Sequence, residues 1–428
     1  MEKGDNAAII ALIESFDEIK RYYIAQVLSK LSAFIKDSSL IAEMKELKRL
    51  REKTPVLTEE DLVFLQEIIS NSMDKALRVD RDSEKRFIIT LDDEEFLGAD
   101  RGELALSSGE QNFLSLTFEF LRAKNNLEEY VVIDDPVSSF DSIYKNKVVY
   151  ALVRMLRHKK RIVLTHNIDL IRLLNVQYRG CYKLYLLNNT EGGENGFIAL
   201  NSEEQKMLVD LSHLLKTFRE SIFSAIENQE LFLCSMIPFM RGYASIIGNK
   251  DCRDSLTLLM HGYCSERVDI ARMYRTLFNI EDDRIADQFE TSAPDLLALN
   301  LEDETDCILD CSLYPLLNKT LQHSLSYLCL RLLVEKSLIE KSDFTVEENM
   351  QLGGIIDKAF PEPKKPTTEE EREEATKQTR RRVFLTSRKT LINEFNHFEG
   401  NLSIFQPAID ISDQMLKKER EGIVEFCS

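Results

Sequence analysis

Apolar residues recur at spacings of three and four through the first part of the chain, with charged and polar side chains between them. This spacing is that of one face of an α-helix, and it predicts an amphipathic helix from residue 8 to about residue 53, where Thr54-Pro55 stops it. A second helix is predicted from residue 58 to about residue 77. The residues that mark the first helix are Ile9, Ile13, Phe16, Ile19, Tyr23, Val27, Leu31 and Phe34.

Short apolar runs alternate with helical stretches in the middle of the chain. Residues 130–133 form a continuous apolar run bounded by turn residues, which predicts a strand covered on both faces. The alternation predicts a largely parallel sheet with helices packed on it, followed by a polar glycine loop at 188–195. Strands are expected at 86–91, 130–133, 161–165 and 182–187, and helices at 107–125, 142–158 and 168–174.

The strand pattern disappears after about Asn201, and helical periodicity continues to the end of the sequence. A stretch from Pro361 to Pro366, followed by glutamates, predicts a charged loop over residues 361–376. Breaks between helices are expected near Pro238, Gly248-Asn249, Pro294 and Pro315. The predicted domains are a helical arm (1–84), which has the pattern of a coiled-coil arm, an α/β lobe (85–200) and an all-helical effector domain (201–428).

The bulk composition narrows the class of protein only slightly. The 428 residues carry a formal net charge of −18, which argues against a generally basic surface for nucleic acid. The sequence contains no run of eighteen apolar residues and no basic segment followed by a short apolar core at its N-terminus. Eight scattered cysteines without a Cys-x-x-Cys pair are typical of reduced thiols. We therefore expect a cytoplasmic protein that does not contact a membrane.

The predicted helix at 107–125 begins with Ser107-Ser108-Gly109. A helix N-terminus offers unpaired backbone N–H groups and a partial positive charge, and a glycine there allows a phosphate to approach the backbone closely. Ser108 and Gly109 would be the contacting residues. The alternative is an ordinary capping box, because Ser107 and Glu110 have the spacing of that motif.

Two carboxylates and a histidine follow the next two predicted strands. Asp134 and Asp135 come directly after a buried run, where adjacent carboxylates need a cation or a proton. Mg²⁺ bound to nucleotide phosphates is the natural partner of Asp134, and Asp135 would face the water that attacks the γ-phosphate. His166 follows the next strand and would bond the γ-phosphate. The alternatives are an N-capping aspartate pair and a histidine satisfied in the core.

These segments resemble the ABC-type ATPases, in particular the branch that includes structural-maintenance and recombination-repair ATPases. Leu106 to Gln111 resembles the family's signature loop, and Val131 to Asp135 resembles its Walker B strand. Ser138 to Asp141 is similar to its D-loop and His166 to its switch histidine. The order and spacing match over roughly residues 85–190.

The resemblance implies a site for ATP and Mg²⁺ on a C-terminal ATPase lobe. It implies Asp134 as the magnesium ligand, Asp135 as the catalytic base and His166 as the sensor of the γ-phosphate. Most ABC proteins carry a glutamate at the position of Asp135, so this residue departs from the family pattern. The sequence from Ile133 to Asp141 is similar to that of the PrrC-type and RloC-type anticodon nucleases. The nucleotide-binding residues that the resemblance implies are Ser107, Ser108, Gly109, Glu110, Gln111 and Asp141.

The sequence lacks the phosphate-binding loop of such ATPases. No Gly-x-x-x-x-Gly-Lys-Ser/Thr occurs, so the backbone cradle, its lysine and its magnesium-binding hydroxyl are missing. In the family that loop lies in an N-terminal lobe separated by a coiled coil, and residues 1–53 resemble the returning half of that coiled coil. We therefore expect the C-terminal half of an ATPase of DNA repair or phage defence, as a fragment, a split gene product or a degenerate copy. The expected partner is a Walker A-bearing N-terminal half or chain, in a head-to-tail dimer with ATP at the interface.

A second constellation lies in the predicted helical domain. Arg331 and Glu335 are four residues apart, and His397 follows in an Asn/His segment; the pattern resembles the catalytic residues of PrrC-like anticodon nucleases. Glutamate and histidine would act as base and acid on RNA, and arginine would stabilise the phosphorane charge. Basic residues at 380–382 and 388–389 would provide a basic approach for RNA phosphates, and a solvated face is the alternative. The expected nucleic-acid partner is DNA or tRNA. The alternatives are an ordinary helix-stabilising pair and an interaction subunit without turnover.

Overall fold

A computed structural model of the chain divides it into two compact units, unit 1 (residues 1–164) and unit 2 (165–428), and each is described by itself. The boundary falls inside the predicted α/β lobe, and the three-part division stays a prediction. None of the described helices is long and apolar enough to cross a membrane. The described residues are 5–52, 63, 66–67, 77–81, 87–91, 94–95, 106–188, 196–299, 307–342, 344–347, 350–362, 366–393 and 404–428.

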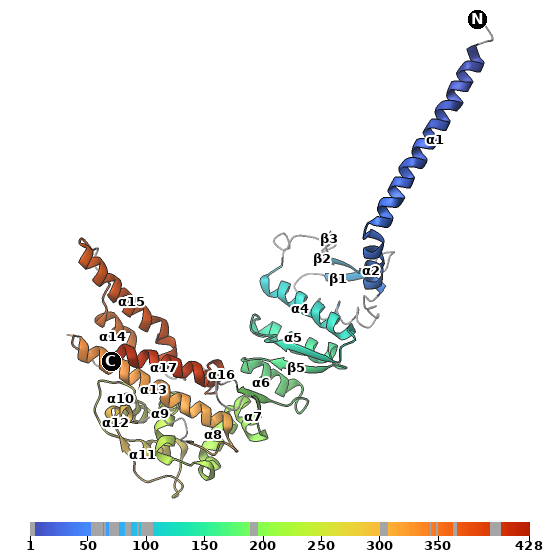
Figure 1. Ribbon diagram of the computed structural model, residues 1–428. Coiled ribbons are helices and arrows are strands. Elements are labelled where there is room, and N and C mark those ends of the chain that lie inside the picture. Colours follow the sequence, from blue (N-terminus) through green and yellow to red (C-terminus); the bar gives the residue numbers. More distant parts are fainter. Residues whose placement is uncertain are drawn as a thin grey trace. The chain divides into compact units, whose positions relative to one another are not determined.

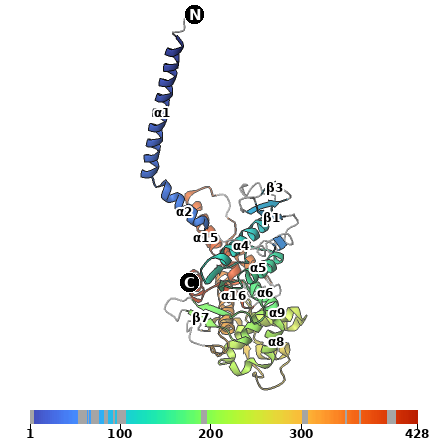
Figure 2. The same cartoon turned by 90° about the vertical axis from the view of Figure 1, so that its right-hand side faces the viewer.

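Unit 1 begins with two helices, α1 (Asp5–Asp37) and α2 (Leu40–Glu52), in place of the single helix predicted over residues 8–53. Ser38 donates to the carbonyl of Ile35 at 3.1 Å, and Ser39 donates to Glu43 at 2.6 Å. Such local side-chain bonds compete with the helical ladder, which explains the break between α1 and α2. In Figures 1 and 2, α1 is a long unbroken rod.

The strands and helices of the central stretch follow their predicted order closely. Strands β1 (Leu77–Arg81), β2 (Phe87–Leu91) and β3 (Glu94–Glu95) pair antiparallel. The predicted helix over residues 58–77 falls mostly outside the described residues. The remaining elements of unit 1 are α4 (Ser108–Asn125), β4 (Tyr130–Asp134), α5 (Ser142–Met155) and β5 (Lys160–Leu164).

Strands β4 and β5 form a parallel pair whose register runs from Tyr130 opposite Lys160 to Asp134 opposite Leu164. On one face Ile133 is buried, whereas Tyr130, Val132 and Ile162 on the other face are 56%, 63% and 45% exposed. The prediction that β4 is covered on both faces is therefore wrong for this structure. The apolar run shows that both faces favour burial, but it does not show which segment supplies the cover.

Unit 2 opens with helix α6 (Ile168–Gln177) and an antiparallel hairpin of β6 (Tyr185–Asn188) and β7 (Gly196–Ala199). The expectation of a largely parallel sheet is correct only for β4 and β5 among the described strands. A second strand follows β6 within a few residues, too few for the crossover that parallel pairing needs, so β6 and β7 pair as a hairpin.

The rest of the described part of unit 2 is helical, as predicted, apart from its loops and two antiparallel strands of two residues each, β8 (Val268–Asp269) and β9 (Glu290–Thr291). The helices are α7 (Ser202–Val209), α8 (Leu211–Glu220), the 3₁₀ turn η1 (Ile222–Ala225), α9 (Gln229–Ile246), α10 (Lys250–Leu258), α11 (Ile270–Phe278), α12 (Ala293–Leu297), α13 (Pro315–Lys341), α14 (Leu352–Ala359), α15 (Glu369–Ile392), α16 (Gln406–Asp410) and α17 (Asp413–Cys427).

Helix α13 is the central element of unit 2, and it packs against α9, α12, α14, α15, α16 and α17 (Figure 1). Its first half, including Leu321 and Leu325, contributes to the core around α9. Its second half, including Val334 and Leu338, contributes to a separate core with α14, α15 and α17. Both hydrophobic cores therefore depend on one helix.

Two predicted interruptions are helical in the structure. Pro238 lies inside α9, where every residue from Phe232 to Met240 is buried, so packing outweighs the roughly 3 kcal/mol that an internal proline costs. The charged loop predicted over 361–376 is wrong for residues 369–376, which form the first turns of α15. Thr368 and Glu371 form a capping box there, and glutamates stabilise a helix N-terminus.

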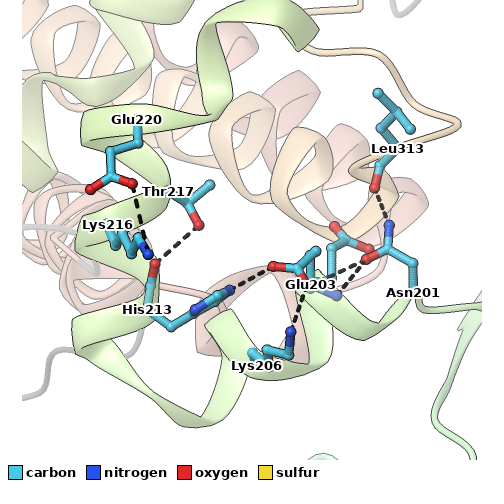
Figure 3. Close-up of polar contacts among 9 residues, drawn as sticks. Asn201, Glu203, Lys206, His213, Lys216, Thr217, Glu220 and Leu313 are labelled. Carbon is cyan, nitrogen blue, oxygen red and sulfur yellow. Dashed lines mark hydrogen bonds and ion pairs between the residues drawn. The ribbon is translucent and has the colours of Figure 1, made fainter.

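A cluster of polar contacts joins α7 to α8 and to the loop before α13 (Figure 3). The Asn201 side chain accepts from the backbone N–H groups of Glu203 and Glu204, both at 2.9 Å, and donates to the carbonyl of Leu313. Glu203 pairs with Lys206 at 2.6 Å and with His213 at 2.8 Å. These hydrogen bonds lower the pKa of the exposed Glu203 carboxyl.

Glu204, next to Glu203, is fully buried instead. One carboxyl oxygen accepts from the backbone N–H groups of Leu316 and Leu317, both at 2.9 Å, at the start of α13. The other oxygen is buried without a hydrogen-bond partner among the described residues. Burial raises the pKa of Glu204 from 4.5 to about 7, and the two backbone bonds offset only part of this shift.

Glu204 should make the stability of the protein fall as the pH rises. Between pH 4.5 and about 7 the folded protein keeps a proton on Glu204 that the unfolded chain has released, so folding is favoured most below this window. Glu204→Gln should remove about 3 kcal/mol of pH-dependent unfolding free energy, measured by denaturant unfolding from pH 4.5 to 8. Glu203→Gln is the matched control, because the lowered pKa of Glu203 acts in the opposite direction. Equal pH slopes in the wild type and Glu204→Gln would contradict this account.

Candidate functional site

Helix α4 begins at the segment that was predicted to approach a phosphate. The Ser107 hydroxyl accepts from the N–H of Glu110 at 3.3 Å, and the Glu110 carboxylate accepts from the N–H of Ser107 at 2.7 Å. The capping-box alternative is therefore confirmed. Gln111 donates to the carbonyl of Leu106 at 3.2 Å, and Ser108 is exposed. The capping box occupies the side chains of Ser107 and Glu110 and leaves the exposed Ser108 side chain outside it.

Gly109 is not required by the packing of the chain itself. A Cβ at this position would lie 3.7 Å from the Tyr144 ring, which is an ordinary van der Waals contact. Glycine also disfavours a helix relative to alanine. A glycine without an internal reason is consistent with the close approach of an external group to this backbone.

Tyr144 brings two of the predicted motif segments together. Its ring contacts Phe113 of α4 with centroids 5.8 Å apart, and Phe140 with centroids 6.4 Å apart. The start of α4 and the segment that contains residues 138–141 therefore both lie close to one aromatic side chain. Asp141 is the N-cap of α5, but its side chain makes no capping hydrogen bond there.

Asp135 has an unusual backbone conformation at the C-terminal end of β4. Its φ is 41°, in the left-handed region that a residue with a Cβ adopts at a cost of roughly 1–3 kcal/mol. Its N–H donates to the carbonyl of Leu164 at 2.7 Å, and its carboxylate accepts from the hydroxyl of Ser138. Asp134 is exposed at the same edge and pairs in register with Leu164. Neither aspartate is the N-cap of α5, so the capping alternative is wrong.

His166 comes two residues after Leu164, in the turn that leads to α6. Its backbone carbonyl accepts from the side chain of Gln406 at 3.0 Å, and Asn167 caps α6 through the N–H of Asp169. The histidine is exposed, so the alternative of a histidine satisfied in the core is wrong.

Arg331 and Glu335 are close together, but both are buried. Their side chains are 3% and 0% exposed, and Arg331 Nε donates to Glu335 at 3.0 Å. Arg331 Nη1 donates to the side chain of Asn393 at 3.0 Å, at the end of α15. His397 lies outside the described residues, so the predicted trio of nuclease residues stays a prediction.

Two further partners of Glu335 were not predicted from sequence patterns. Its second carboxylate oxygen accepts from the N–H of Gly262 at 2.9 Å and lies 3.3 Å from His261 Nδ1. A Cβ at Gly262 would come within 2.2 Å of the carbonyl oxygen of Leu332, so glycine is required for this approach. His261 and Gly262 precede Glu335 by more than seventy residues, and no local pattern links them. We name Arg331, Glu335, His261, Gly262 and Asn393 the Glu335 network.

The described residues contain no cluster of three or more histidine, cysteine or carboxylate side chains that would hold a metal ion. Asp134 therefore fits Mg²⁺ only as a single carboxylate ligand, with phosphate and water oxygens as the others. This is the usual coordination of Mg²⁺ at nucleotide sites.

Breaking the Glu335 network should destabilise the fold. Glu335→Gln leaves the buried guanidinium of Arg331 without its counter-charge and sets an amide N–H against other donors. We expect the free energy of unfolding to fall by about 3–5 kcal/mol, measured by denaturant unfolding. The control is Lys336→Gln on the same helix, whose ion pair with Glu340 is exposed and long at 3.9 Å, and it should change stability by less than about 1 kcal/mol. Equal effects of the two substitutions would contradict a structural role for Glu335.

The similarity of this chain to a known family lies in the segment that contains most of the candidate site residues. Residues 96–237 match the family model described as an AAA domain. Neither the curated proteins nor the solved structures include a match to the chain. The matched segment contains the start of α4, the aspartates after β4 and His166, and it is about a third of the sequence. At this coarse level, the match supports an AAA-type, P-loop-like ATPase domain in this part of the chain.

Proposed function

We propose that this chain supplies one half of an ATP-hydrolysing site and that a segment with a Gly-x-x-x-x-Gly-Lys loop supplies the other half. The observation that carries the proposal is the strained backbone of Asp135 at the end of parallel strand β4, with Asp134 beside it. Strain of this kind is found where a side chain must be held for a ligand or a reaction.

Each residue of the proposed site has a distinct role. Asp134 binds Mg²⁺ on the nucleotide phosphates, and Asp135 orients or deprotonates the attacking water, held by its bond from Ser138. His166 follows β5 and senses the γ-phosphate. Ser108 and Gly109 at the start of α4 meet the γ-phosphate of a nucleotide across a head-to-tail interface. Gln111 and Asp141 complete the proposed contacts to the nucleotide, and Ser107 and Glu110 contribute by forming the capped helix start that presents them.

Two exposed apolar surfaces of unit 1 support the proposal that another segment packs against it and supplies the second half of the ATP site. Tyr130, Val132 and Ile162 leave one face of the β4–β5 pair exposed, although parallel strands are normally covered on both faces. The apolar stripe of α1 is exposed as well; Phe16, for example, is 66% exposed. A Walker A-bearing lobe with an outgoing coiled-coil helix would cover both surfaces. The proposed setting is DNA repair or phage defence, with DNA or tRNA as the nucleic acid.

We do not adopt the anticodon-nuclease reading as the function. A general base must reach the hydroxyl from which it takes a proton, and the Glu335 carboxylate is fully buried in its network. Arg331 donates hydrogen bonds to Glu335 and Asn393 rather than to a substrate. The contacts of the Glu335 network support a structural role for both residues, and the nuclease trio with His397 stays a prediction.

Asp135→Asn should lower ATP hydrolysis by roughly 10²–10⁴-fold, because the amide cannot accept a proton from water. The measurement is phosphate release by the full chain purified together with its Walker A-bearing partner. Glu129→Gln, just before the same strand, is the control; its exposed ion pair with Lys160 should not affect turnover.

Unchanged hydrolysis in Asp135→Asn would show that Asp135 is not the base. A complex that binds but never hydrolyses ATP would instead favour an interaction subunit without turnover.

A further inference from the structure

Two cysteines in the loop before α13 lie unusually close together. The sulfur atoms of Cys307 and Cys311 are 2.9 Å apart, whereas a disulfide bond is about 2.05 Å long. Cys311 is exposed and Cys307 is partly exposed, so a small molecule can reach the pair. This contact is independent of the proposed nucleotide site.

The backbone between the two cysteines is anchored on both sides. Ile308 and Leu309 donate their N–H groups to the side chain of Asn318 in α13, both at 3.0 Å. The N–H of Asp310 donates to the carbonyl of Ala225 at 2.8 Å. These backbone hydrogen bonds to other parts of unit 2 therefore hold the two sulfur atoms close to each other.

The segment after Asp310 is fixed as well. The Asp310 carboxylate accepts from the N–H of Ser312 at 2.8 Å and from its hydroxyl at 2.6 Å. The N–H of Tyr314 donates to the Asp310 carbonyl at 2.9 Å, immediately before α13 begins at Pro315. Cys311 thus lies in a turn that cannot move far from Cys307 without breaking these bonds.

We propose that Cys307 and Cys311 form a reversible disulfide when the protein meets a low-molecular-weight disulfide oxidant such as glutathione disulfide. The Cys307 thiolate attacks the oxidant, which forms a mixed disulfide and releases one thiolate of the oxidant. The Cys311 sulfur loses its proton and then attacks Cys307 Sγ, which releases the second thiolate of the oxidant. The two protein thiols are oxidised to one disulfide, and the oxidant is reduced to two thiols.

The surroundings of Cys311 determine the order of these steps. Burial, followed by the contact with Cys307, raises the pKa of the Cys311 thiol to about 12. Glu227 and Asp310 act in the same direction, because negative charge disfavours a second anion. Since the thiolate is the nucleophile, Cys311 suits the second, intramolecular step, in which proximity compensates for weak ionisation.

The test is mass spectrometry of the full chain after incubation with glutathione disulfide. The peptide that contains both cysteines should lose two hydrogens and carry no glutathione, and dithiothreitol should reverse the change. The exposed Cys181 is the internal control, since it has no sulfur partner among the described residues and should carry a glutathione adduct. Cys311→Ser should leave a stable glutathione adduct on Cys307, because the second step is removed.

Two results would overturn the proposal. The first is glutathione on both Cys307 and Cys311 of the wild type without an intramolecular bond. The second is a Cys311→Ser variant in which Cys307 stays a free thiol under conditions that modify Cys181. Thermal unfolding of each variant before oxidation verifies that the loop is folded, and Cys307→Ser serves as a second variant, in which the internal disulfide cannot form.

Discussion

The parallel pairing of β4 with β5 is the constraint on which the proposed site depends. It ends with Asp134 opposite Leu164, and the bond from the Asp135 N–H to the Leu164 carbonyl holds Asp135 in a left-handed conformation. Two adjacent carboxylates are thereby brought to the C-terminal edge of the strands, which is where ligands bind in parallel α/β sheets. The strain is tolerated because the ladder and the Ser138 hydroxyl fix both the backbone and the carboxylate.

In the proposal, this chain supplies only half of an ATP-hydrolysing site. Two aspartates lie at the end of β4, a histidine follows β5, and α4 begins with a capping box beside the exposed Ser108. None of these groups replaces the cradle of N–H groups and the lysine that bind the β- and γ-phosphates in P-loop enzymes. The open face of β4 and β5 and the exposed stripe of α1 are two further indications that unit 1 packs against another segment.

The sequence predicted the elements from residue 107 to residue 177 well, because each carries its own apolar run and two of the helices carry their own cap. Ser107 with Glu110 and Asn167 are local signals that act within three residues. Prediction failed where distant packing decides the outcome. Pro238 stays helical inside a buried helix, and His261 reaches Glu335 from another part of the chain. The roles expected for Asp134, Asp135 and His166 came from the chemistry of their side chains after buried strands, and the family resemblance implied the same roles.

Gly109→Ala tests the central claim most directly. It adds a single methyl group, whose effect on stability can be measured separately from its effect on ATP hydrolysis. The structure has room for the added methyl group beside Tyr144, and alanine favours the helix. We predict that the melting temperature stays the same or rises slightly, while ATP hydrolysis by the chain with its Walker A-bearing partner falls at least about tenfold, because a helix start with a Cβ at this position no longer lets a phosphate approach the backbone as closely. Full activity in a stable Gly109→Ala protein would contradict the account of this helix start as half of an ATP site.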